Sequence, residues 1–415
     1  MKSLLSLFLI SFIWCQSIHE LEMEKYKNQV RTGLDIIISE KVEMIKEKNI
    51  GLVTNHTGID RNGKSNYDIL MKLDDVHLKS IFSPEHGFFG NVSGGRKVDD
   101  RQLDDFPTIY SLYGKTRKPT PVMLEGLDII IYDIQDVGAR FYTYISTLGL
   151  VMEAAGEAGI PVIVLDRPNP LGGEKIEGPV LDMNFKSFVG MYPIPIRYGL
   201  TVGELAKMII GEKWITAIPD LTVIEMEGWE RDRYFNETGL PWITPSPNIP
   251  DLETAFLYPG MALLEAIPIV SEGRGTNHPF NWIGAPWING RKLSQIMNNK
   301  NLPGVEFEPV TFTPESIPGK ALNPKYEHEK CHGVSIKIID YRQFESVLTG
   351  IHLIAAIRQL YPNYFETKSS LSRLWGNNDL DQLSSLDINQ DELLLSYQRS
   401  IQQFKTIALK YYLYE

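Results

Sequence analysis

The sequence predicts an α/β protein with a large domain built on a mainly parallel sheet, followed by a smaller α/β domain. From Lys48 to about residue 210, short apolar runs alternate with helical patterns, which is typical of βαβ units. A proline-rich segment follows, and beyond it strand and helix patterns resume. The 415 residues, 43% of them hydrophobic, are enough for two globular domains.

Four strands are predicted in the first domain. Each is a short apolar run rich in β-branched residues, as expected for strands that helices cover on both faces. They span residues 49–54 (NIGLVT), 77–82 (HLKSIF), 128–132 (DIIIY) and 161–165 (PVIVL). Thr201 and Glu204 then form a capping box, which predicts a helix through about Ile210.

The boundary between the domains is predicted at residues 244 and 245. Prolines are frequent between Pro241 and Pro268, and each restricts the preceding residue to extended geometry. The two domains are therefore 18–244 and 245–415. The second is predicted to contain a strand at 333–340, a helix at 344–360 and an amphipathic helix at 391–411 whose apolar face packs on the core.

Residues 1–17 predict a cleavable signal peptide. Lys2 precedes an apolar run from Leu4 to Trp14 that is too short to span a bilayer of about 30 Å. Cleavage after Ser17 is favoured over lipid anchoring at Cys15, because bulky Trp14 stands where a lipoprotein needs a small residue. The expected product is periplasmic or secreted, has no integral membrane span, and keeps Cys331 as its one thiol, expected to be buried.

The overall charge argues against a nucleic-acid partner. Lysine and arginine total 41 against 52 acidic residues, which gives a net charge of −11, and no dense basic block interrupts the sequence. No motif calls for a cofactor, and nothing in the sequence indicates the oligomeric state.

Polar side chains follow each of the four predicted strands. Ligands of open α/β sheets bind at the carboxyl ends of the strands, so these residues define a candidate rim. The rim residues are Asn55 and His56, then Glu85 and His86, then Gln135 and Asp136, and finally Arg167 and Asn169. Turn formation explains Asn169 well, but not the Glu85–His86 or Gln135–Asp136 pairs. The sequence therefore predicts a functional site on this rim.

Glu85 is the leading candidate for a reacting group. It follows Pro84 in a tight turn near Phe88, and an apolar, aromatic surround favours the protonated carboxyl that a general acid requires. Asp136 begins a stretch that contains Arg140 and Tyr142, a composition that suits a sugar or carboxylate pocket.

A glycine-bearing loop in the second domain is the other candidate region. It runs over residues 271–280 (SEGRGTNHPF) and contains Glu272, Arg274 and Asn277. We expect this loop to close over the rim, with a plain surface turn as the alternative.

Two further patterns suggest other chemistries more weakly. Residues 58–65 match a phosphate-loop pattern, but three residues separate them from the preceding strand. His56, His86 and Asp136 offer metal ligands, although no two histidines have a ligand spacing such as HxH or HxxxH. We therefore expect no metal.

The motifs at the strand ends together resemble the NamZ family of exo-β-N-acetylmuramidases. The resemblance rests on TNHTG, FSPEHGF, DIQDVGARFYTY, LDRPNPLGG, EGPVLD, SFVGMYPIPIRYGLTVGELA, YPG, SEGRGT and GAPW, and covers roughly residues 30 to 415 in order. It implies a Rossmann-like first domain without a nucleotide, a smaller second domain and an active-site cleft between them. It also implies release of terminal N-acetylmuramic acid (MurNAc) from the non-reducing ends of peptidoglycan fragments, such as a MurNAc–GlcNAc disaccharide or muropeptides, during cell-wall turnover and recycling.

Carried over to this sequence, the resemblance makes Glu85 the leading candidate for the catalytic acid. Where an acidic residue was expected after Phe280, the chain has Asn281. Hydrolysis usually needs a second carboxylate, for which Asp136 comes first and Glu177 and Glu272 follow. The lactyl carboxylate of muramic acid calls for a fixed cation, with Arg140, Arg167 and Arg274 as the candidates. The competing interpretations are a non-catalytic periplasmic sugar-binding protein and an exported metal-dependent esterase or deacetylase.

Overall fold

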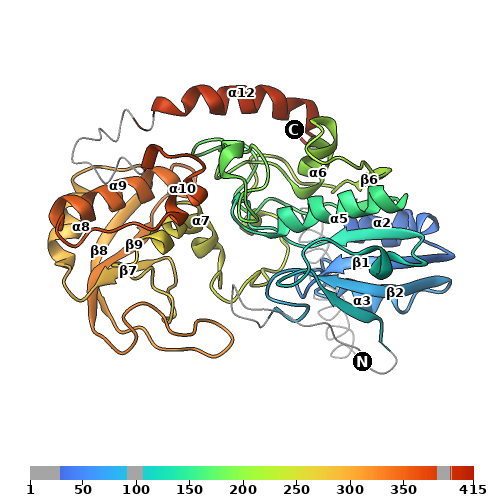
Figure 1. Cartoon of the computed structure of the whole chain (residues 1–415), viewed down its shortest axis with the longest axis horizontal. Coiled ribbons are helices and arrows are strands. Elements are labelled where there is room, and N and C mark those ends of the chain that lie inside the picture. Colours follow the sequence, from blue (N-terminus) through green and yellow to red (C-terminus); the bar gives the residue numbers. More distant parts are fainter. Residues whose placement is uncertain (1–28, 91–105, 381–392, 394) are drawn as a thin grey trace, which may run out of the picture.

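The protein consists of two domains that lie side by side (Figure 1). The structure is a computed structural model and describes residues 29–90, 106–380, 393 and 395–415. The predicted fold class is confirmed: a parallel sheet with helices on both faces forms the first domain, and a smaller domain with an antiparallel sheet follows. The predicted signal peptide lies outside the described residues.

The sheet of the first domain has six parallel strands in the order β3-β2-β1-β4-β5-β6. The strands are β1 (Lys48–Thr54), β2 (Val76–Ser83), β3 (Thr108–Ser111), β4 (Ile129–Asp133), β5 (Val162–Leu165) and β6 (Leu221–Ile224). All four predicted strands are confirmed. The sequence missed β3 and β6, because each is a partly exposed edge strand of only four residues.

Alternate residues of the central strands pack on two different helix layers. Ile130 and Tyr132 face the layer that contains α5 and α6, whereas Ile129 and Ile131 face the layer that contains α2 and α3. The helices are α2 (Gly33–Glu40), α3 (Asn66–Leu70), α4 (Pro121–Leu124), α5 (Tyr144–Ala158) and α6 (Val202–Gly211), with short 3-10 turns at Val42–Met44, Met183–Phe185 and Phe235–Glu237. The predicted capping box of α6 is present, with Thr201 and Glu204 bonded reciprocally.

The strand order reverses between β1 and β4, the usual ligand position in such sheets. Here buried side chains fill it: Arg167 Nε lies 2.6 Å from Asp133 Oδ1, and Asn66 Nδ2 donates to Asp133 Oδ2 at 2.7 Å. A cavity of only about 10 Å³ remains, roughly the room of one water molecule. The site must therefore be sought elsewhere on the rim.

The phosphate-loop alternative fails on local geometry. Ile59 pairs with Ser65 across the segment, and Asp60 Oδ1 accepts hydrogen bonds from the amides of Asn62 (2.9 Å) and Lys64 (2.7 Å). The segment is thus a closed hairpin, and its inward-turned amides are already bonded. The helix that follows, α3, has only five residues.

The second domain combines a three-stranded antiparallel sheet, in the order β7-β9-β8, with helices. Its elements are α7 (Leu252–Met261), η4 (Ala262–Ala266), β7 (Trp282–Ala285), α8 (Gly290–Asn298), β8 (Val305–Phe312), β9 (Cys331–Ile338), α9 (Ser346–Leu360) and α10 (Ser370–Trp375). The predicted strand and helix correspond to β9 and α9, each within two residues. Cys331 is buried, as expected. The sequence missed β7 and β8.

The C-terminal segment returns to the first domain. Helix α12 (Gln398–Ala408) and the turn η6 (Leu409–Tyr411) extend across both domains (Figure 1). Ile401, Phe404 and Ala408 form the buried face that was predicted, while most of residues 381–394 lies outside the described ranges. Tyr414 donates to Asp166 at 2.7 Å, so residues counted with the second domain by chain position pack on the first.

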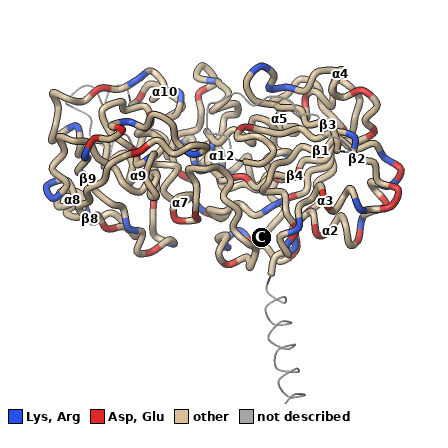
Figure 2. The backbone as a smooth tube through the Cα atoms, turned by 90° about the horizontal axis from the view of Figure 1, so that it is seen from below, with Lys and Arg blue, Asp and Glu red and all other residues tan. Residues whose placement is uncertain are grey.

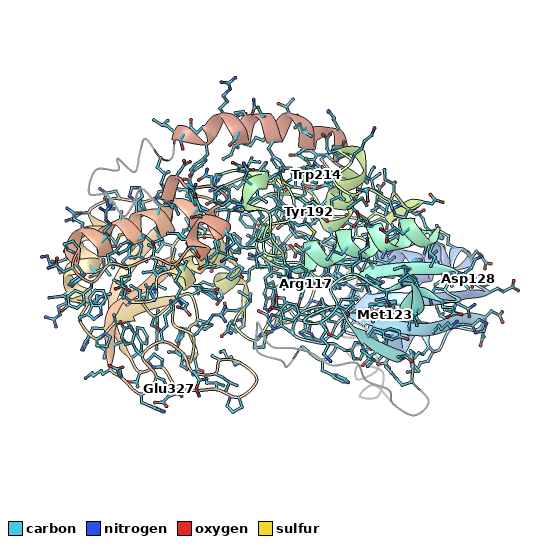
Figure 3. The ribbon with its side chains drawn as sticks, in the orientation of Figure 1. Arg117, Met123, Asp128, Tyr192, Trp214 and Glu327 are labelled. Carbon is cyan, nitrogen blue, oxygen red and sulfur yellow. The ribbon has the colours of Figure 1, made fainter. Side chains whose placement is uncertain are left out.

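The carboxyl ends of the parallel strands face the second domain. Asp128, just before β4, lies at the far end of the first domain (Figure 3). The boundary predicted at residues 244 and 245 lies in the segment between β6 and α7. Basic and acidic residues are interspersed over both domains (Figure 2). None of the helices in the described ranges is long and apolar enough to cross a membrane.

Candidate active site

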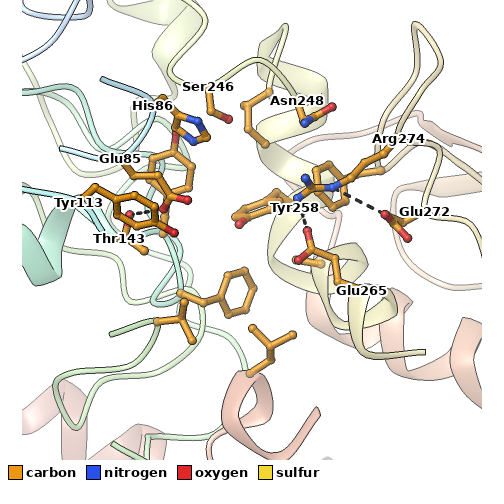
Figure 4. Close-up of a pocket in the computed structure, with 17 residues that line it drawn as sticks. Glu85, His86, Tyr113, Thr143, Ser246, Asn248, Tyr258, Glu265, Glu272 and Arg274 are labelled. Carbon is orange, nitrogen blue, oxygen red and sulfur yellow. Dashed lines mark hydrogen bonds and ion pairs between the residues drawn. The ribbon is translucent and has the colours of Figure 1, made fainter. Parts of the chain in front are cut away.

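A cavity of about 390 Å³ lies between the two domains, and residues of both line it (Figure 4). Its polar and aromatic wall in the first domain comprises Glu85, His86, Tyr113, Phe141, Tyr142 and Thr143. The facing wall comprises Ser246, Asn248, Tyr258, Glu265, Glu272, Arg274 and Phe280. The loop 271–280 thus contributes Glu272, Arg274 and Phe280 to the wall opposite the rim, and its closure over the rim stays a prediction.

Glu85 projects from a strained turn that directly follows β2. The amide of Gly87 donates to the carbonyl of Pro84 at 3.1 Å, which closes the turn. His86, within this turn, has a φ of +71°, in the left-handed region that is costly for a residue with a side chain. Strained backbone of this kind concentrates at functional sites, where it aims side chains.

The surroundings of Glu85 are more polar than the sequence suggested. Phe88 turns away and packs on Tyr67, with ring centroids 4.9 Å apart. In its place, Thr143 Oγ1 donates to Glu85 Oε2 at 2.8 Å, and the phenol of Tyr113 also hydrogen-bonds to Glu85. Burial, reinforced by the charge of Glu85, raises the pKa of Tyr113, so that this phenol remains a neutral donor.

The hydroxyl of Thr143 does not cap its helix. It is the N-cap residue of α5, yet its side chain makes no capping hydrogen bond. Threonine at this position commonly accepts from a helix amide. Here the hydroxyl instead orients a carboxylate on the neighbouring strand end.

We therefore expect Thr143→Val to lower kcat about 10- to 100-fold, the equivalent of one hydrogen bond to a charged group. Thr143→Ser keeps the hydroxyl and should retain most of the activity. Steady-state kinetics of both variants on one substrate checks this. If valine and serine were equally active, Thr143 would have no positioning role.

The facing wall is built where α7 changes into a 3-10 turn. Pro259 has no N–H to bond within the helix, and two residues later the α-helix gives way to η4, which carries Glu265. Arg274 Nη2 donates to Glu265 Oε1, and Arg274 Nε lies 3.6 Å from Glu272 Oε1. These pairs fix one guanidinium between two carboxylates on the cavity wall (Figure 4).

Of the residues proposed from sequence, five line this cavity. They are Glu85, His86, Tyr142, Glu272 and Arg274. The other nine lie outside its wall, and in eight of these nine residues the polar group has a protein partner.

Asp136, the first choice for the second catalytic carboxylate, and Glu177, one of the two behind it, are among those nine. Asp136 is buried and accepts hydrogen bonds from Tyr198 and from the amide of Gly138; burial raises its pKa to about 6, against the effect of these donors. Glu177 lies 2.7 Å from Arg197 and accepts from the amide of Val347 at 2.9 Å. Both carboxylates are thus held by protein groups, and Glu177 lines a separate cavity of about 750 Å³.

Two of the three arginines proposed for the lactyl carboxylate are bound to other protein groups. Arg140 donates to four backbone carbonyls, those of Pro179, Ile194, Leu374 and Trp375, and so ties the two domains together. Arg167 pairs with Asp133 at the sheet's switch point. Arg274 is the one of the three that lines the cavity.

The remaining five residues do not line the cavity, and four of them contact other protein groups. Asn55 donates to the phenol of Tyr144, and His56 lies 2.7 Å from the carbonyl of Thr244. Gln135 donates to the carbonyls of Asp136 and Pro168, and Asn169 donates to the carbonyl of Leu200. Asn277 is exposed on the loop. The turn-forming interpretation of Asn169 is thus in accord with its contacts.

Sequence reasoning missed several residues that form the cavity. Thr143 lies inside a motif that had been singled out, but nothing local distinguishes its hydroxyl from that of any helix cap. Glu265 had one available signal, because it is the single acid in the apolar run at residues 261–267 (MALLEAI). Within the described ranges, no group of three or more His, Cys, Asp or Glu side chains is arranged to hold a metal ion.

The fold and the cavity together define the class of protein. Carboxylates from two domains face each other across a cavity lined with phenols, hydroxyls and an arginine, an arrangement suited to acid-assisted cleavage of a glycosidic bond. The chain is a glycosidase, and two family models, the N-terminal and C-terminal parts of exo-β-N-acetylmuramidase NamZ, match residues 50–253 and 256–414. It belongs to the NamZ family.

Three relatives match nearly the whole chain. The peptidoglycan β-N-acetylmuramidase NamZ of Bacillus subtilis is 44% identical over 392 residues, which cover 94% of this chain and 92% of that protein. Two crystal structures of DUF1343 family proteins from Bacteroides fragilis are also similar. One has a TM-score of 0.85 at 35% identity and covers 94% of this chain and 100% of its own. The other has a TM-score of 0.76 at 34% identity and covers 93% and 99%.

Proposed function

We propose that this chain is an exo-acting glycoside hydrolase that releases terminal β-1,4-linked MurNAc from the non-reducing ends of peptidoglycan fragments. The observation that carries the proposal is Glu85, held by Thr143 on the wall of a cavity between two domains. The substrate class follows from the named activity of the Bacillus subtilis relative. The role in cell-wall turnover and recycling is part of the same proposal.

In the proposed reaction, Glu85 donates its proton to the glycosidic oxygen as the bond from that oxygen to C1 of the sugar breaks. Tyr113 and Thr143 fix the direction of the carboxyl. The exo mode of action follows from the description of the two family models that match the chain. The cavity of about 390 Å³ between the domains is the proposed place of the terminal sugar. Arg274 is the proposed partner of the lactyl carboxylate.

One assay separates this function from the two alternatives. The chain from residue 18 onward should release MurNAc from a MurNAc–GlcNAc disaccharide at the same rate with and without a chelator. Activity that a chelator removes would favour the metal-dependent hydrolase. Binding of the disaccharide without turnover would favour the sugar-binding protein.

We also propose that the protein is exported to the periplasm or secreted, with cleavage after Ser17. The support is the apolar run between Leu4 and Trp14 and the residues that follow it. N-terminal sequencing of the exported protein should begin at Ile18, whereas a lipid-linked Cys15 at the N-terminus would contradict the proposal.

A further inference from the structure

We propose that Glu265, on η4 of the second domain, is the carboxylate that acts opposite Glu85 and activates the attacking water. The inference rests on the proposed glycosidase function and names a residue for the role that the sequence left open. Glu265 lines the same cavity as Glu85 and projects from the facing wall (Figure 4).

The other carboxylates are less available to a sugar. Asp136 and Glu177 lie outside the cavity wall. Glu272 is in the wall, but its side chain is only 7% exposed and its Oε2 lies 2.8 Å from the ammonium of Lys325. The side chain of Glu265 is 34% exposed, so its carboxylate can reach both a substrate and a water molecule.

A chain of alternating charges holds Glu265 in place. Lys325 is fixed by three backbone carbonyls, each 2.9 Å from its ammonium, and pairs with Glu272. Glu272 lies beside Arg274, and Arg274 pairs with Glu265. The guanidinium of Arg274 thus fixes the Glu265 carboxyl on the cavity wall.

The two walls give the two carboxyl groups different partners. Thr143 and Tyr113, the partners of Glu85 described above, are neutral hydroxyls, whereas Glu265 is paired with a cation. We assign the acid role to Glu85 and the base role to Glu265 from their positions on opposite walls of the cavity.

The proposal includes an inverting course for the reaction. The carboxylates come from different domains with the cavity between them, and an inverting glycosidase needs such room for a water molecule. Glu85 gives its proton to the glycosidic oxygen, which keeps the electron pair of the broken C1–O bond. The water oxygen bonds to C1 from the opposite face, and the water's proton goes to Glu265.

Rescue by azide tests this assignment. With 4-nitrophenyl β-MurNAc as substrate, Glu265→Ala should lower kcat at least about 100-fold. Sodium azide needs no deprotonation, so it should restore the rate at least about tenfold and yield the α-glycosyl azide. The matched control is Glu272→Ala, which disturbs the same charge cluster and should show no azide rescue. Proton NMR of the wild-type reaction should show α-MurNAc as the first product.

Defined results would overturn the inference. These are a Glu265→Ala rate within tenfold of wild type, a folded variant without azide rescue, or β-MurNAc as the first product. If the alanine variant does not fold, Glu265→Gln keeps the side-chain volume, and the same loss is expected. Wild-type protein that releases no MurNAc would refute the proposed function itself, whereas wild-type release with a dispensable Glu265 would refute only this inference.

Discussion

Glu85→Gln should reduce turnover of the MurNAc–GlcNAc disaccharide by about 10³-fold or more, near the upper range for loss of a general acid. Glutamine has almost the same shape and keeps an oxygen that can accept from Thr143, but it has no proton to give to the leaving sugar. The loss should therefore appear in kcat, with the affinity for the disaccharide nearly unchanged.

The leaving group provides the control for this prediction. The 4-nitrophenolate of 4-nitrophenyl β-MurNAc departs without protonation, so Glu85→Gln should retain far more activity on this substrate than on the disaccharide. Rates are measured for wild type and variant on both substrates. Equal losses on the two would mean that Glu85 supports the site without acting as the acid.

Glu177→Gln should destabilise the protein by about 3 to 5 kcal/mol, the usual cost of breaking a buried ion pair. Its partner, Arg197, has a side chain that is 1% exposed, and neutralising Glu177 leaves that charge without its counterion. Glu177 also accepts a hydrogen bond from the amide of Val347 in the first turn of α9. The substitution therefore weakens a contact between the two domains. The midpoint of urea unfolding, compared at similar m values, measures the loss.

The exposed neighbour Glu174 supplies a matched control, because Glu174→Gln should change stability by no more than about 0.5 kcal/mol. Below its unfolding temperature, Glu177→Gln should keep kcat within a small factor of wild type, since Glu177 does not line the cavity. If the Glu177→Gln variant were folded and stable but inactive, Glu177 would again be a candidate for a catalytic residue.

Much of the first domain could be predicted from the sequence because its central strands are buried on both faces. Such strands leave unbroken apolar runs, as in β1 and β4, and turn and capping residues mark where the next elements begin. The edge strands β3 and β6 lack that signal, since solvent reaches part of each. Strand β8 exposes Glu306, Glu308 and Pro309 to solvent, so its sequence lacks an apolar run that would predict a strand.

The part of the candidate site that directly follows a strand of the parallel sheet could be predicted from the sequence. Glu85 follows β2, and the rule that ligands meet the carboxyl ends of parallel strands placed it on the rim correctly. The same rule also selected Asp136 and Arg167, which fold inward and pair with Tyr198 and Asp133. Whether a polar side chain at a strand end faces a ligand or a protein partner depends on neighbours that are remote in the chain.

The sequence by itself thus determined the family, the fold class and the position of one candidate carboxyl, Glu85, because these depend on local periodicity and on residues that follow one another. Only the tertiary structure decided which groups join Glu85. Thr143 reaches it across 58 positions of the chain, and Glu265 and Arg274 come from another domain. A guanidinium bound by four carbonyls, as in Arg140, and one that faces a cavity, as in Arg274, look alike in a sequence. Burial and long-range hydrogen bonding distinguish them, and both arise only when the chain has folded.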